Sequence, residues 1–505
     1  MGNKIIYHIA KVGDLLIGHN YPVRIQSMVN TDTSDVYSTV NQILELAEEG
    51  CEIVRITTRS VSDAKLLYDI KNKLYQNNCT IPIIADIHFN PKAAIAAAEY
   101  VEKIRINPGN YIDKKDSKTS FTSKETEEIL KRAKDNLFEL TEICKKHNTA
   151  IRIGSNHGSL SDRIIKKYGN TALGMVESVA EFIDIFKELD FYNLVLSLKS
   201  SNPLIMLQAN RLLYNRMKNN NEFFPIHLGV TEAGAGNSAR IKSAIGIGSL
   251  LYEGIGDTLR VSLSENPVNE IKPAKIIAKI KETYNNNPPD NEYNKFNTKP
   301  KIVNLDIDIN DFIDNSKYSI IDVSNLNLSE INKVVKDTYN KSDKKIILKK
   351  FYKNINNTDY NHNLSEELII NISFEISYIL LHLPIYAFET DIDNNFLLDI
   401  LQATKIKLTK PEYISCPTCG RTEYDLITLL EDVKAKTSHL KDITIGIMGC
   451  IVNGPGEMLG ADYGIVGFGK GKVLLYKNGE KVGSPIEPKD APKALLNLIE
   501  KDINK

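Results

Sequence analysis

The chain has 505 residues, 42% hydrophobic and 25% charged as in ordinary globular proteins, and this length suggests two or three domains. Its 63 basic and 64 acidic residues give a formal net charge of −1, which creates no overall field for nucleic acid or an anionic membrane. We see no apolar run of about eighteen residues that would span a membrane, no signal-peptide pattern, and too few cysteines for a disulfide framework. We therefore expect a cytoplasmic protein with no nucleic-acid or membrane partner.

The first 284 residues alternate between strand-like and helical segments. Residues 4–23 predict a hairpin, and eight short β-branched segments follow at 24–28, 53–57, 81–86, 103–107, 150–154, 194–198, 226–231 and 258–263. Helical patterns lie between them, for example at 36–49, 91–100, 124–147, 173–189 and 203–218. Eight strand–helix units over about 260 residues match a (β/α)8 barrel. We predict an α/β TIM-type barrel over residues 1–284, with a doubly wound open sheet as the structural alternative.

Two further domains are expected after the barrel. A polar linker begins at residue 285, and residues 285–403 predict an inserted α/β domain of uncertain fold, with strands at 318–323 and 345–348 and a helix at 329–339. Residues 404–505 predict an α+β domain with a helix at 424–437, a strand at 443–448 and a glycine-rich hairpin at 464–476.

The glycines at 246 and 248 lack the setting of a dinucleotide fingerprint, so we interpret them as turns.

Three of the six cysteines lie in the last hundred residues. Cys416 and Cys419 are spaced C-x-x-C, and Cys450 follows thirty-one residues later, just ahead of glycines and Glu457. Three thiolates with a fourth, unusual ligand suit an iron–sulfur cluster with one addressable iron. A zinc site lacks a fourth soft ligand, and a redox disulfide leaves Cys450 unused, but both remain open.

Cations dominate the polar residues at the carboxyl ends of the predicted barrel strands. They are Arg55, Arg105, Arg152, Lys199 and Arg260. Because a barrel builds its site at these strand ends, the cations would converge on one mouth, which is costly unless an anion binds there. Arginine forks match phosphate oxygens, so we predict a phosphorylated ligand. Structural ion pairs with Asp86 or Glu232 are the simpler interpretation for one arginine, but not for five cations at equivalent positions. Glu232 is the carboxylate best placed for proton transfer.

Two other classes of protein stay open on these residues. One is a barrel lyase that acts on a phosphorylated substrate, with Lys199 as a Schiff base and a structural zinc. The other is a non-catalytic metal-ribbon protein, against which the neutral charge and the lack of a basic, aromatic surface count.

Several motifs, in order along the chain, resemble one family. They are Asn30–Thr33, Ala85–Asn90, Arg105–Asn110, Arg152–Leu160, Leu228–Gly234, Gly254–Ser262 and both cysteine motifs. Together they resemble the 4-hydroxy-3-methylbut-2-enyl diphosphate synthase family, iron–sulfur enzymes of the non-mevalonate isoprenoid pathway. The resemblance covers about residues 5–280 and 400–480.

This resemblance implies an iron–sulfur oxidoreductase. It would convert 2-C-methyl-D-erythritol 2,4-cyclodiphosphate to (E)-4-hydroxy-3-methylbut-2-enyl diphosphate, with two electrons from ferredoxin or flavodoxin. A [4Fe-4S] cluster would be bound by Cys416, Cys419, Cys450 and Glu457.

The family's substrate residues carry over by position in the same way. The diphosphate contacts correspond to Arg55, Arg105, Arg152, Lys199, Arg260 and Ser262. Asn156 and Glu232 would lie near the reacting carbons, with Glu232 and Glu457 as catalytic residues. Short members form head-to-tail homodimers, so a homodimer is possible here. We hypothesise that the insert instead lets the cluster domain close over its own barrel.

Overall fold

The computed structural model describes residues 4–87, 89–111, 121–284, 302–303, 317–352, 364–416, 422, 424–451, 454–458, 460–469 and 471–503. Its largest sheet has eight parallel strands: β4 (Arg24–Met28), β5 (Ile53–Thr57), β6 (Ile83–Asp86), β7 (Lys103–Ile106), β8 (Ala150–Asn156), β9 (Leu194–Lys199), β11 (His227–Leu228) and β12 (Thr258–Leu259). β12 pairs with β4, and a bridge between Leu196 and Ile226 joins β9 to the β11 segment. The sheet therefore closes, which confirms the barrel and rules out the open sheet.

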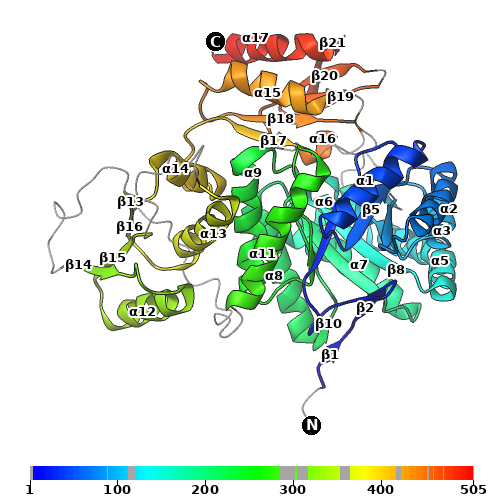
Figure 1. Ribbon diagram of the computed structural model, residues 1–505, viewed down its shortest axis with the longest axis horizontal. Coiled ribbons are helices and arrows are strands. Elements are labelled where there is room, and N and C mark those ends of the chain that lie inside the picture. Colours follow the sequence, from blue (N-terminus) through cyan, green and yellow to red (C-terminus); the bar gives the residue numbers. More distant parts are fainter. Residues whose placement is uncertain are drawn as a thin grey trace.

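Helices cover the outside of this barrel (Figure 1). They include α1 (Val36–Glu48), α2 (Val61–Gln76), α3 (Pro91–Ala98), α5 (Ser123–His147), α7 (Ala172–Glu188), α8 (Pro203–Asn220), α9 (Gly236–Ser243), α10 (Ser249–Tyr252) and α11 (Ile271–Tyr284). The capping residues Asp35, Ser60 and Asn202 each accept a backbone N–H of the first turn, so α1, α2 and α8 begin where the sequence places a cap. None of the described helices has the length and hydropathy of a membrane span.

The hairpin predicted at the N-terminus closes the bottom of the barrel. Strands β2 (Ala10–Val12) and β3 (Leu15–Ile17) pair antiparallel. Their side chains pack against residues at the amino ends of the barrel strands, such as Ile53 and Ile84. Because this end is filled with apolar side chains, the opposite, carboxyl end of the strands is left for a site.

The insert contributes a parallel sheet of its own, in the order β13 (Ile302–Val303), β16 (Ala387–Thr390), β15 (Lys345–Lys350) and β14 (Tyr318–Asp322). Its helices are α12 (Leu328–Lys341), α13 (Glu366–His382) and α14 (Asn394–Ala403). Helix α13 packs on the barrel, where the rings of Phe374 and Tyr378 lie 5.7 and 4.8 Å from that of Tyr252. The insert and the barrel thus share one apolar core.

This packing corrects our interpretation of the glycines at 246 and 248 as turns. Both lie in a π-helical turn (Ala244–Gly248) between α9 and α10. A Cβ at Gly248 would approach the Phe374 ring to 3.2 Å, and one at Gly246 would approach Val230 to 2.6 Å. The glycines allow close packing of helix and strand, a long-range requirement that the local pattern does not show.

The C-terminal sheet has the order β17 (Glu412–Ser415), β18 (Thr444–Met448), β19 (Tyr463–Gly467), β20 (Val473–Lys477) and β21 (Glu480–Ile486). The first three strands are parallel and the last two are added antiparallel. Helices α15 (Leu426–Thr437) and α17 (Ala491–Ile503) pack on this sheet, and the short helix α16 (Gly454–Glu457) lies between it and the barrel (Figure 1). The domain boundaries at 284/285 and 403/404 stay predictions.

Candidate active site

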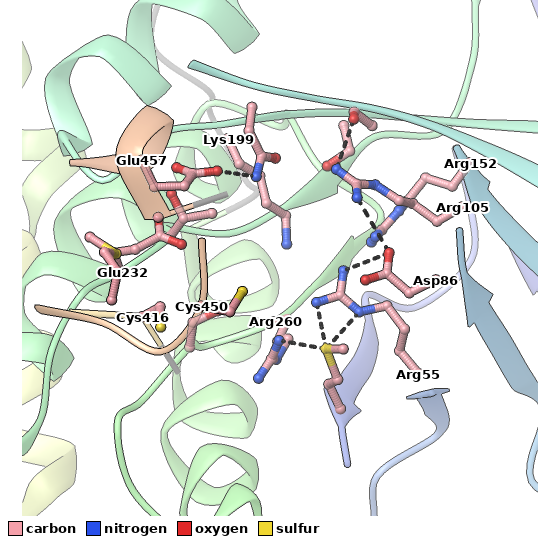
Figure 2. Close-up of a pocket in the computed structure, with 18 residues that line it drawn as sticks. Arg55, Asp86, Arg105, Arg152, Lys199, Glu232, Arg260, Cys416, Cys450 and Glu457 are labelled. Carbon is pink, nitrogen blue, oxygen red and sulfur yellow. Dashed lines mark hydrogen bonds and ion pairs between the residues drawn. The ribbon is translucent and has the colours of Figure 1, made fainter. Parts of the chain in front are cut away.

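One cavity lies between the mouth of the barrel and the C-terminal sheet of the same chain. It is lined by Arg55, Arg105, Arg152, Asn156, Lys199, Glu232, Arg260, Ser262, Cys416, Cys450 and Glu457. Figure 2 shows their side chains converging from barrel strands on one side and from the cysteine loops on the other. Every predicted site residue in the described part of the chain therefore reaches this cavity. Cys419 lies outside the described residues.

Strand register explains how the cations come together. Arg105 on β7 is the register partner of Arg152 on β8, and Asp86 on β6 is the partner of Arg105. Asp86 accepts from Arg105 at 3.3 Å and lies 3.9 Å from Arg55 Nη1. The buried carboxylate of Asp86 thus pairs with both Arg55 and Arg105, as expected if these two arginines form structural ion pairs.

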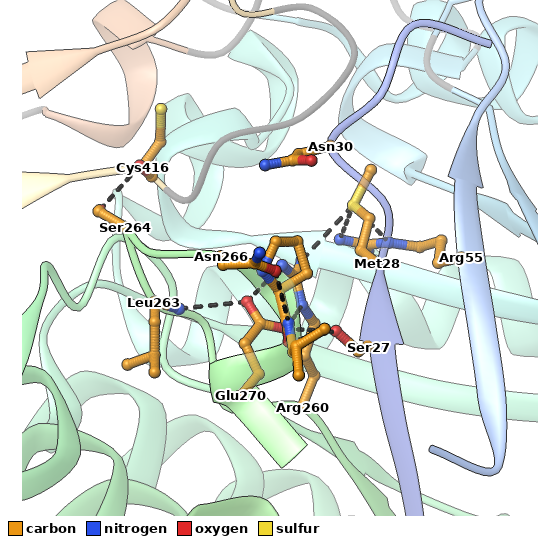
Figure 3. A network of polar contacts seen from close by, with 12 residues as sticks. Ser27, Met28, Asn30, Arg55, Arg260, Leu263, Ser264, Asn266, Glu270 and Cys416 are labelled. Carbon is orange, nitrogen blue, oxygen red and sulfur yellow. Dashed lines mark hydrogen bonds and ion pairs between the residues drawn. The ribbon is translucent and has the colours of Figure 1, made fainter. Parts of the chain in front are cut away.

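Arg260 is held from behind by Glu270, at the end of a 3₁₀ helix (Pro267–Glu270). Its Nε and Nη2 donate to the two carboxylate oxygens at 2.9 and 2.8 Å. Glu270 also accepts from the Ser27 hydroxyl at 2.7 Å and from the Leu263 amide at 3.2 Å (Figure 3). This bidentate pairing fixes the orientation of the Arg260 guanidinium group at the cavity wall. Sequence reasoning missed Glu270, because no local pattern links it to Arg260.

Met28 is a second residue that sequence reasoning missed. Its sulfur lies 3.1 and 2.9 Å from Nε and Nη2 of Arg55, and 3.4 Å from Nη1 of Arg260. The thioether therefore separates two guanidinium groups at the cavity wall (Figure 3). Sulfur is a weak acceptor, so this contact stabilises the pair less than a carboxylate would.

Arg152 and Lys199 differ from the other cations, because the described residues offer neither of them a carboxylate partner. Arg152 is 1% exposed, and its Nε and Nη1 have no hydrogen-bond partner. Burial, with the charges of Arg55 and Arg105 next, lowers the pKa of Arg152 well below its ordinary value. Burial, followed by the charges of Arg152 and Arg55, does the same to the pKa of Lys199. Buried cations without partners are costly, so the site is built for an anionic ligand.

The lowered pKa of Lys199 predicts that the free energy of unfolding depends on pH. Between the lowered value and about 10.4, the unfolded chain binds a proton at Lys199 that the folded chain does not, so the free energy of unfolding rises with pH. We expect Lys199→Met to stabilise the ligand-free protein at neutral pH, with a gain that shrinks towards pH 10. Urea denaturation across a pH series measures this, with the exposed Lys65→Met on α2 as control. A gain that is the same at every pH would contradict it.

Glu232 stands on a strained loop that also contacts the C-terminal domain. Its φ is +49°, a left-handed conformation that costs a side chain other than glycine about 1 kcal/mol or more. The next residue, Ala233, forms a β-bridge with Ser415, the residue before Cys416. Burial, with the charge of Glu457 next, raises the pKa of Glu232 well above its ordinary value. Burial thus favours the protonated form of Glu232 in a cavity that is otherwise rich in cations.

The two described cysteines of the predicted cluster share one environment. The Gly449 amide donates to Cys416 Sγ at 3.2 Å, and the Ser264 hydroxyl donates to the Cys416 carbonyl at 3.0 Å. Burial, and next the charges of Cys416 and Cys450, raise the pKa of Tyr424 well above its ordinary value. The Tyr424 hydroxyl donates to the Met448 carbonyl at 3.0 Å. In the described part of the chain, no three Cys, His, Asp or Glu side chains lie close enough to form a metal site.

Glu457 reaches the cavity from α16 and contacts the barrel. Its Oε1 accepts from Asn156 Nδ2 at 2.5 Å. Beside this bond, Gly158 and Gly456 approach so closely that a Cβ on Gly158 would overlap the Gly456 carbonyl and lie 2.6 Å from the Glu457 amide nitrogen. These two glycines and this hydrogen bond add to the contacts of Ser415 and Cys416 that join the C-terminal domain to the barrel of its own chain.

Comparison with known proteins covers both ends of the chain. The family model described as the GcpE TIM-barrel domain matches residues 8–275, and that of the GcpE protein C-terminal domain matches residues 412–501. The 4-hydroxy-3-methylbut-2-en-1-yl diphosphate synthase (flavodoxin) of Parabacteroides distasonis is 37% identical, over 98% of this chain and 97% of its own length. The proteins of the same name from Leptospira interrogans and Porphyromonas gingivalis are also 37% identical, over 97% and 98% of this chain and 95% and 97% of their own lengths.

Proposed function

The chain belongs to the GcpE family, and we propose that it catalyses the reductive ring opening and dehydration of 2-C-methyl-D-erythritol 2,4-cyclodiphosphate to (E)-4-hydroxy-3-methylbut-2-enyl diphosphate. The reaction consumes two electrons and two protons and releases one water. The observation that carries this proposal is the cavity itself, where two cations to which the described residues offer no carboxylate partner line the same space as two thiols and Glu457. A cyclic diphosphate supplies the missing negative charge.

The donor set in this cavity fits an iron–sulfur cluster. Cys416 and Cys450 would hold it together with Cys419 and Glu457, and glycine backbone, such as the Gly449 amide at Cys416, lies within reach of sulfur. Backbone N–H groups near cluster sulfurs tune the reduction potential. When bound, a [4Fe-4S] cluster supplies single electrons and a Lewis-acidic iron.

The remaining residues bind the substrate and move protons. Arg152 and Lys199 would hold diphosphate oxygens, supported by Arg55, Arg105, Arg260 and Ser262 around the same cavity. Asn156 orients Glu457 through its side-chain amide. Glu232, whose protonated form burial favours, would deliver a proton to the departing hydroxyl oxygen so that it leaves as water. The C-terminal domain above the mouth would keep bulk water from the reaction.

Anaerobic purification tests this function directly. We expect near-stoichiometric iron and acid-labile sulfide, and turnover of the cyclodiphosphate with a flavodoxin donor. Zinc in place of iron would support the alternative lyase, which the lowered pKa of Lys199 favours because a neutral amine can form a Schiff base. Borohydride trapping of Lys199 with a carbonyl substrate would then follow.

The electron donor and the assembly are also proposals. The relatives' name points to flavodoxin rather than ferredoxin as the donor. The cavity is completed by residues of one chain, which supports our hypothesis that the insert lets the cluster domain close over its own barrel. Small-angle scattering would detect a homodimer, and the cytoplasmic location stays a prediction.

Arg152 gives a prediction in which function and stability change in opposite directions. We expect Arg152→Met to weaken substrate binding at least about tenfold, since a charged hydrogen-bond partner contributes about 1.5–3 kcal/mol. The same change removes an unpaired buried charge, so the ligand-free protein should gain about 1–4 kcal/mol of stability. Calorimetric titration with the substrate and urea denaturation measure the two effects. A loss of both would contradict a binding role.

A further inference from the structure

We propose that the electron donor, an acidic flavoprotein, docks on a surface formed by Ile451, Phe468, Lys472 and Lys481 of the C-terminal domain. This donor surface, as we call it, rests on the proposed function, because it matters only if electrons reach the cysteine site from a partner protein. No residue of the donor surface lies in the substrate cavity.

Two exposed apolar side chains place the donor surface beside the cysteine site. Ile451 is 42% exposed and directly follows Cys450. Phe468 is 41% exposed and directly follows Gly467, where a Cβ would overlap the Gly449 carbonyl oxygen. The backbone at Phe468 therefore lies against the segment Gly449–Cys450. Two separate segments thus present exposed apolar side chains close to one predicted ligand.

The charges around these side chains indicate the kind of partner. Lys481 Nζ lies over the Phe468 ring, 5.4 Å from its centroid, and the exposed Lys472 accepts from the Phe468 amide at 2.9 Å through its carbonyl. Residues 463–479 contain three lysines and no acidic residue, and the third, Lys477, is paired with Asp502. An apolar centre with a basic rim complements an acidic protein that presents the apolar edge of a flavin ring.

The other side of the cysteine site faces the barrel and is already covered. Glu457 bonds to Asn156 there, and Gly456 is packed against Gly158. While the C-terminal domain covers the mouth of the barrel, a donor protein cannot reach the cysteine site from the barrel side. The donor surface lies at the ends of β18 and β19, where exposed residues adjoin Cys450, and so offers electrons a short path.

The experiment compares two electron sources in the full-length, anaerobically reconstituted protein. We expect Phe468→Ser and the pair Lys472→Glu with Lys481→Glu each to raise the KM for flavodoxin about tenfold or more, because steering and apolar contact are both lost. Turnover with dithionite-reduced methyl viologen, which needs no docking surface, should stay at the wild-type level. The pair should also weaken the dependence of the flavodoxin reaction on ionic strength.

A matched control uses exposed residues on the barrel. Tyr68→Ser and Lys65→Glu on α2 change the same kinds of side chain far from the cysteines and should leave both reactions unchanged (Figure 1). An unchanged KM for flavodoxin in the Phe468 and lysine variants would overturn the donor surface. An equal loss with both electron sources would also overturn it, because the residues would then support the site itself. A wild-type protein that turns over with neither source would overturn the proposed function.

Discussion

Glu457→Ala is expected to abolish most turnover while the chain stays folded. Glu457 is 5% exposed and lies in a four-residue helix, and it belongs to none of the apolar clusters that stabilise the barrel and the C-terminal domain. The charge of Glu457 is one cause of the raised pKa of Glu232, so its removal should lower that pKa. Loss of a group that only supports a metal ligand costs about 10–100-fold, so we expect a loss of at least about 100-fold for a ligand itself.

The measurements for Glu457 are turnover, iron and sulfide content, and thermal unfolding. Glu457→Gln is the matched control, since its amide oxygen can still accept from Asn156 while its neutral group is a poorer iron ligand. We expect the glutamine variant to be as inactive as the alanine variant, with iron that is lost more readily than in the wild type. Near-normal turnover in either variant would remove Glu457 from the mechanism.

Gly158→Ala is expected to lower kcat about 100-fold, although Gly158 touches no substrate-binding residue that we have assigned. Its φ lies outside the left-handed region, so alanine strains no backbone there. The added Cβ would overlap the Gly456 carbonyl and press on the Glu457 amide, which must move the C-terminal domain off the barrel mouth. A displacement of about 1 Å in a catalytic group can cost about 100-fold in rate.

The reciprocal variant tests the same contact from the other side. A Cβ on Gly456 would overlap the Gly158 carbonyl, so Gly456→Ala should give the same loss. In both variants the iron content and melting temperature should match the wild type, while small-angle scattering should show a larger radius of gyration. If kcat and radius stay at wild-type values, the close approach of the two glycines does not position Glu457.

Much of the fold could be predicted because its signals are local. The eight strand segments of the barrel alternate with helices whose caps are present in the sequence, and the closed sheet confirms this order. The cations at the strand ends could be placed at one mouth because parallel strands present their carboxyl ends on the same side. The C-x-x-C pair and the isolated Cys450 indicated an incomplete metal site in the same way, through spacing alone.

The contacts that give each site residue its surroundings are long-range, and the sequence shows them only in part. The engagement of the Arg260 fork by Glu270, the sulfur of Met28 between two arginines, and the left-handed backbone of Glu232 follow no local pattern. The glycines at 246 and 248 looked like turns because the side chains that require them, Val230 for Gly246 and Ile280 and Phe374 for Gly248, lie on other elements of the fold.

The sequence by itself therefore determined the barrel, the family and the set of candidate site residues, since strand periodicity, motif order and residue chemistry are properties of short segments. Only the tertiary structure decided which cations lack a carboxylate partner, and that the C-terminal domain covers the barrel of its own chain. Both depend on how distant segments pack. A charge is paired or unpaired, and two glycine backbones meet, only once the whole chain has folded around them.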